Sequence, residues 1–112
     1  MNALPNLKII CNKVVDAYKK IYGDKIRGIY LYGSYARGDF DEDSDIDFAA
    51  VVNGDRLDLQ NKCHGVWNEA NKIDLEYDVI TSPTVIPADE FEKYRDELPY
   101  YKNILTEGKL LA

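Results

Sequence analysis

The pattern of hydrophobic and polar residues changes along the first third of the chain. Between residues 6 and 22 apolar side chains recur every three or four positions, which predicts a helix with one apolar stripe. A Gly-Asp pair follows and indicates a turn. Residues 26–32 are rich in Ile, Leu and Tyr and predict a strand. This strand is expected to end at Gly33 and Ser34.

The next segment predicts a short helix, a loop and a second strand. Residues 34–38 can form one helical turn, and residues 39–44 are polar and acidic, which is typical of a loop. Residues 45–52 predict a strand in which Asp45 and Asp47 share one face, because alternate side chains of a strand point to opposite sides.

The rest of the chain predicts one long helix, a third strand and short helical pieces. A helix is expected over residues 55–72, and alternation predicts a strand over residues 73–82 that a proline ends or kinks. Residues 84–86 could extend a neighbouring strand, and residues 89–94 and 100–107 predict short helices. The order predicts an α+β or α/β two-layer domain with a small sheet and helices packed on one side.

Length and composition fit one compact domain over residues 1–112. Hydrophobic residues make up 46% of the chain and charged residues 30%. No apolar run approaches the roughly 20 residues needed to span a bilayer, so we expect no membrane partner. Cys11 and Cys63 are far apart and fit no metal-binding spacing, which favours reduced thiols in a cytoplasmic protein.

The formal net charge is -6 at pH 7, which disfavours a protein that binds nucleic acid through many phosphates. The acidic residues are concentrated between Asp39 and Asp47. A solvated loop accounts for the first four of them, Asp39, Asp41, Glu42 and Asp43.

A solvated loop does not account for Asp45 and Asp47, which stand in the apolar sequence of the second strand. Two carboxylates on one strand face lie about 7 Å apart, and burying them unpaired is costly. A cation between them is therefore expected. A calcium loop is excluded, because Ser44 takes the position that needs glycine and Ala50 the one that needs glutamate.

A divalent metal for phosphoryl-type chemistry fits the carboxylate pair better. Mg²⁺ prefers oxygen ligands and is usually bound by one or two carboxylates plus substrate phosphates. A pair of metals can hold the attacking and leaving oxygens of an in-line displacement, for which a third carboxylate from a neighbouring strand is needed. Asp74, Glu76 and Asp78 share one face of the predicted third strand, and any of them could serve.

Upstream of the two aspartates, three residues have properties suited to binding a phosphate group. Gly33 lets the backbone approach closely, Ser34 adds a hydroxyl donor, and Arg37 offers a planar set of donors. A Gly-Ser turn alone is common, and it is the combination with the two aspartates that favours a metal site for phosphoryl-type chemistry.

Gly33-Ser34, ten residues and then Asp45-x-Asp47 resemble the signature of the DNA polymerase beta-like nucleotidyltransferase superfamily. The surrounding string GSYARGDFDEDSDIDFAAVV resembles its minimal nucleotidyltransferases. The resemblance implies a small mixed sheet flanked by helices. It implies as well that Gly33 and Ser34 hold a nucleoside triphosphate and that Asp45 and Asp47 bind Mg²⁺ in a two-metal site.

The resemblance also implies a third carboxylate on the strand after the second helix. Val79, Ile80 and Pro83 follow Asp78 in an arrangement similar to that of the superfamily, so we place the third catalytic and metal-binding carboxylate at Asp78. Asp74 is the alternative.

The implied reaction transfers AMP from ATP, as nucleotide donor, to a hydroxyl acceptor and releases pyrophosphate. Many minimal nucleotidyltransferases resemble antitoxins paired with a HEPN-domain toxin, and some transfer AMP to tyrosines of that toxin. We therefore expect a HEPN-domain protein partner. Transfer to RNA or a small molecule, and a non-catalytic module that neutralises a partner by contact, remain alternatives. The oligomeric state is left open.

Overall fold

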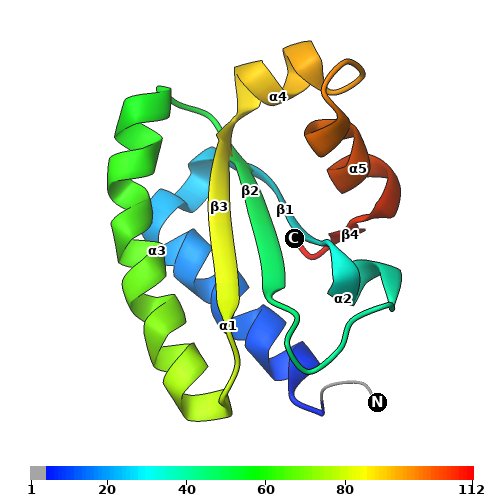
Figure 1. Ribbon diagram of the computed structural model, residues 1–112. Helices are drawn as coiled ribbons and strands as arrows, with labels where there is room; N and C mark the ends of the chain where they lie inside the picture. Colours follow the sequence, from blue (N-terminus) through cyan, green and yellow to red (C-terminus); the bar gives the residue numbers. More distant parts are fainter. Residues whose placement is uncertain (1–4) are drawn as a thin grey trace.

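A computed structural model describes residues 5–112 and contains one mixed four-stranded sheet with helices on both faces (Figure 1). In chain order the elements are α1 (Leu7–Tyr22), η1 (Gly23–Lys25), β1 (Ile26–Tyr32), α2 (Ser34–Arg37), β2 (Ile46–Val52), α3 (Arg56–Tyr77), β3 (Thr81–Pro87), α4 (Ala88–Tyr94), α5 (Pro99–Glu107) and β4 (Lys109–Leu110). The strand order is β3-β2-β1-β4.

Two kinds of strand pairing make the sheet mixed. β1 is antiparallel to β2 on one side and to β4 on the other. β3 is parallel to β2, and the long helix α3 makes the crossover between them. The prediction of an α+β domain with a small mixed sheet is confirmed.

The larger core lies between the sheet and the two long helices. α1 and α3 pack against each other and against one sheet face. Tyr18 of α1 and Phe48 of β2 are fully buried there, and the Tyr18 hydroxyl donates to the Thr84 carbonyl of β3 at 2.7 Å. The apolar stripe predicted for residues 6–22 is the face of α1 that enters this core.

A smaller core lies on the opposite face, where α4 and α5 cover one end of the sheet (Figure 1). Ala49 and Val51 of β2 pack there against Phe91 of α4 and Ile104 of α5. The helices are therefore not confined to one side, although the two long ones are. The rest of this face carries the polar residues of the candidate site.

The predicted strand over residues 73–82 is wrong for most of its length. α3 continues to Tyr77, Ile73 is buried on its inner face, and Leu75 is 87% exposed. Asp78 ends the helix in a left-handed conformation, with φ 53° and ψ 53°. The strand begins only at Thr81, so Pro83 lies inside it.

β3 is an edge strand, which is why it tolerates Pro83 and Pro87. Side chains of α3 bind two of its carbonyl groups. The Trp67 indole N–H donates to the Pro83 carbonyl at 2.9 Å, and the Gln60 amide donates to that of Val85 at 3.5 Å.

Other sequence predictions are met by the structure. The helix of residues 6–22, the strand of 26–32 and the two short helices after residue 87 all form close to the expected bounds. Cys11 and Cys63 are buried free thiols. No helix within residues 5–112 combines the length and apolar character needed to cross a membrane. The prediction of one domain over residues 1–112 also covers residues 1–4, which lie outside the described part.

Candidate active site

The turn after β1 brings the backbone against a carboxylate of β2. Gly33 has φ 73° and ψ -154°, a conformation that other residues rarely adopt. A Cβ atom at this position would collide with the Asp47 carboxylate. Glycine is therefore required both by the turn and by the close approach. Ser34 follows at once as the first residue of α2.

Asp47 lies in the sheet, and Asp45 lies just before it. Asp47 is half-buried and pairs with Tyr32 of β1, whereas Asp45 is exposed. Burial raises the pKa of the Asp47 carboxyl, the nearby Asp45 raises it further, and Arg37 partly offsets both. The two carboxylates are close enough to repel, as expected of a pair that holds a cation.

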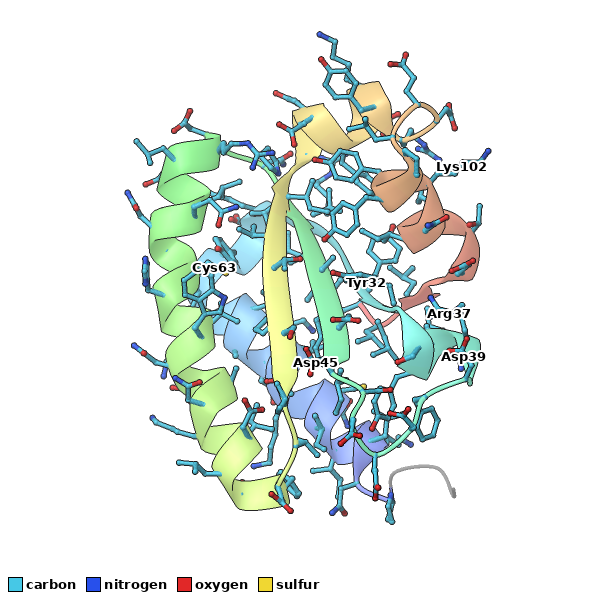
Figure 2. All side chains as sticks on the ribbon, viewed as in Figure 1. Tyr32, Arg37, Asp39, Asp45, Cys63 and Lys102 are labelled. Atoms are coloured by element: carbon cyan, nitrogen blue, oxygen red, sulfur yellow. The ribbon has the colours of Figure 1, made fainter. Side chains whose placement is uncertain are left out.

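Arg37 lies at the end of α2, where Figure 2 shows it beside Asp39. Its Nε atom donates to Asp39 at 3.2 Å, and its Nη1 atom lies 3.5 Å from a carboxylate oxygen of Glu107 in α5. The side chain is exposed. Arg37 is thus close enough to affect Asp47 while being held by two carboxylates.

The acidic loop between α2 and β2 is solvated, as predicted for Asp39, Asp41, Glu42 and Asp43. Asp41 organises this loop: its carboxylate accepts from the Asp43 amide at 2.9 Å and from the Ser44 hydroxyl at 3.1 Å. The side chains of Asp41 and Ser44 therefore hold the shape of the loop.

The three candidates for the third carboxylate are not on the strand next to Asp47. Asp74 lies in the last turn of α3 and accepts from the Thr81 amide at 2.9 Å and its hydroxyl at 2.8 Å. Glu76 lies on the same helix, 3.6 Å from the Lys13 ammonium group. Asp78 caps α3 and lines a hollow with Asp43 and Ser44 that neither Asp45 nor Asp47 lines.

Residues with hydroxyl groups take the paired strand positions on both sides of Asp47 instead. Ser82 of β3 pairs with Asp47 on the side opposite Tyr32. The Tyr32 and Tyr100 hydroxyls are hydrogen-bonded at 3.0 Å, and Figure 2 shows Tyr32 between β2 and α5. Thr84 of β3 donates to the Phe48 carbonyl at 3.0 Å. Sequence reasoning missed Ser82, since its place beside Asp47 depends on the register of β3.

This arrangement fits one cation better than two. Asp45 and Asp47 supply the one or two carboxylates with which Mg²⁺ is usually held alongside phosphates. Within residues 5–112 no group of three His, Cys, Asp or Glu side chains is close enough to hold a metal. The residues present therefore fit a metal–nucleotide complex but do not fit the predicted two-metal site.

Comparison with known sequences agrees with the site. Residues 11–111 match the family described as Nucleotidyltransferase domain. The chain belongs to the nucleotidyltransferase domain family. Two Methanocaldococcus jannaschii proteins named "Putative protein adenylyltransferase", MJ0604 and MJ0141, are similar to it. MJ0604 is 33% identical over 87% of this chain and 89% of its own length. MJ0141 is 32% identical over 80% and 92%.

Comparison with solved structures supports the same fold for this nucleotidyltransferase. A chain of a toxin–antitoxin complex crystallised with AMP-PNP superposes with a TM-score of 0.58 at 24% identity, over 91% of this chain and 72% of that one. A chain of the complex between the tri-AMPylated Shewanella oneidensis HEPN toxin and its MNT antitoxin gives 0.53 at 21% identity, over 94% and 71%.

Proposed function

We propose that this nucleotidyltransferase binds ATP with Mg²⁺ and transfers AMP to a tyrosine hydroxyl of a HEPN-domain partner, acting as its antitoxin in the cytoplasm. Gly33 and Ser34 receive the triphosphate, and Asp45 and Asp47 hold the metal that balances its charge. In the transfer, the acceptor oxygen bonds to the α-phosphorus. The bond from the α-phosphorus to the bridging oxygen breaks, pyrophosphate leaves with the electron pair, and the acceptor proton passes to solvent.

The observation that carries this proposal is the contact between the turn at Gly33 and the Asp47 carboxylate. A side chain at position 33 would occupy the space where backbone and carboxylate meet. A phosphate bound at the turn would therefore lie beside a metal bound to Asp47. Such proximity converts charge repulsion between triphosphate and protein into binding through a shared cation.

Arg37 supplies the remaining positive charge in the proposal. It reaches the site electrostatically, since it lowers the pKa of Asp47 against the effects of burial and Asp45. Its partners Asp39 and Glu107 are exposed, so the guanidinium can exchange them for phosphate oxygens at little cost. An arginine in this place would stabilise charge on the phosphates.

The similar proteins support the choice of acceptor and partner. Both Methanocaldococcus relatives bear names of protein adenylyltransferases, and the neighbouring structures include an AMPylated HEPN toxin with its MNT antitoxin. The net charge of -6 suits a basic protein partner better than nucleic acid.

A direct test is AMP transfer to a HEPN-domain protein supplied as the candidate partner. The protein is incubated with α-labelled ATP, Mg²⁺ and that partner, and label on the partner is mapped by mass spectrometry. Wild type is expected to label a tyrosine, and Asp47→Asn is expected to bind the partner without labelling it. Wild type that binds the partner but transfers no label under any divalent metal would refute the transfer.

One observation favours a second candidate, a nucleotide-binding module that neutralises its partner by contact alone. None of the seven described residues of β3, Thr81–Pro87, is acidic, so the carboxylate expected beside Asp47 is not there. In this case ATP binding and toxin inhibition would persist without any label on the partner.

A further inference from the structure

The position next to Asp47 on β3 is occupied by a neutral hydroxyl. The parallel register pairs Asp47 with Ser82, and paired residues of neighbouring strands point to the same sheet face. Both side chains are half-buried. Ser82 is therefore the residue of β3 that stands beside the Asp45–Asp47 pair.

Charge determines what this position can hold. Asp45 and Asp47 together carry two negative charges, which balance one divalent cation. A second divalent cation a few ångströms away is repelled by the first unless a further anion lies between or beside them. A serine hydroxyl is a neutral and weaker ligand for Mg²⁺ than a carboxylate, because hard divalent cations bind charged oxygens most strongly.

Three other carboxylates, those of Asp74, Asp78 and Glu90, lie in other surroundings. Asp74 is bonded to Thr81, and Asp78 faces the separate hollow beside Asp43. Glu90 of α4 is paired with Arg56 and bonded to the Tyr101 hydroxyl.

We infer that the nucleotide site of this chain holds a single divalent cation, and that Ser82 is the residue that keeps the second metal position weak. This inference rests on the proposed nucleotide site and specifies its metal content. It predicts that one substitution, Ser82→Asp, creates the missing position.

The experiment counts metal ions in the nucleotide complex. Mn²⁺ is titrated into the full chain with a saturating non-hydrolysable ATP analogue. Electron paramagnetic resonance then distinguishes free from bound Mn²⁺ and so gives the number of ions bound per chain. Wild type is expected to bind one Mn²⁺ per chain with the nucleotide. Ser82→Asp is expected to bind two, the second at least about tenfold more tightly than in Ser82→Asn, which has the same shape without the charge.

Asp78→Asn is the control for the other candidate carboxylate. It is expected to leave the wild-type count at one. Two tightly bound Mn²⁺ ions in wild type would overturn the inference, as would a second ion that disappears in Asp78→Asn. The wild-type count decides the matter even if Ser82→Asp does not fold.

The inference and the proposed function fail in different ways. Loss of the proposed nucleotide site would appear as no Mn²⁺-dependent binding of the analogue in wild type and in Asp47→Asn alike. Failure of the inference alone would appear as normal analogue binding with two metals in wild type.

Discussion

The two faces of β2 differ at the end of the strand where Asp47 lies. On one face Ile46, Phe48 and their successors at every second position are fully buried against α1 and α3. On the other, Ala49 and Val51 are buried in the smaller core, whereas Asp47 is half-buried and faces the turn at Gly33. One strand can therefore anchor the core and still hold repelling carboxylates at one end, because its buried residues supply the stability that this repulsion lowers.

The largest effect is expected on the buried face. Phe48→Ala should lower the free energy of unfolding by about 3–5 kcal/mol, because a fully buried aromatic side chain leaves a cavity. Urea denaturation followed by circular dichroism measures the change. A loss below about 1 kcal/mol would show that this face does not anchor the core.

On the polar face, Asp47→Asn should weaken ligand binding without lowering the stability of the fold. The affinity for Mg²⁺–ATP should fall about a hundredfold, or ~2.7 kcal/mol, because half of the metal-binding charge is lost. The melting temperature should stay or rise, since burial and Asp45 already disfavour the charged form of Asp47. Calorimetric titration and thermal melting test both, and a large fall in melting temperature would contradict the comparison.

Gly33→Ala should lower both the stability of the fold and the affinity for nucleotide. The positive φ and the collision with Asp47 should lower stability by about 1–3 kcal/mol and weaken nucleotide binding. Gly23→Ala is the matched control, because its φ is also positive but a Cβ atom there meets nothing within 4 Å. Equal loss of ATP affinity in both variants would argue against a special role of the contact with Asp47.

Glu107→Gln should have the smallest effect. Removing one exposed partner of Arg37 should leave the melting temperature unchanged and raise the affinity for ATP by up to about threefold. Glu97→Gln, an exposed glutamate before α5, serves as control. A fall in ATP affinity would instead mean that Glu107 positions Arg37 for the phosphates.

Sequence patterns predicted the first half of the fold well, because its elements are punctuated by clear signals. β1 ends at a glycine whose positive φ other residues rarely adopt, and α1 has a continuous apolar stripe. The family signature likewise placed Gly33 and Asp47 together. Short-range patterns suffice here since the contact joins two adjacent strands.

In the second half of the chain, the prediction was wrong at the boundary between α3 and β3. Leu75, Tyr77 and Val79 alternate with polar residues as a strand would, yet the first two belong to α3. The three- and four-residue spacing of the buried residues of α3 continues to Ile73, and that signal could have extended the helix. The place of Ser82 beside Asp47 could not have been found this way, because parallel register is set by packing across the whole sheet.

The bonded edge of β3 has a consequence for how this protein can associate. An exposed edge strand usually invites a second chain to add a strand and so promotes aggregation. Here two prolines remove amide donors, while Trp67 and Gln60 use the carbonyls of Pro83 and Val85. Another chain finds few backbone groups free along β3, so a partner on this side must bind through side-chain surfaces, and growth of the sheet from this edge is disfavoured.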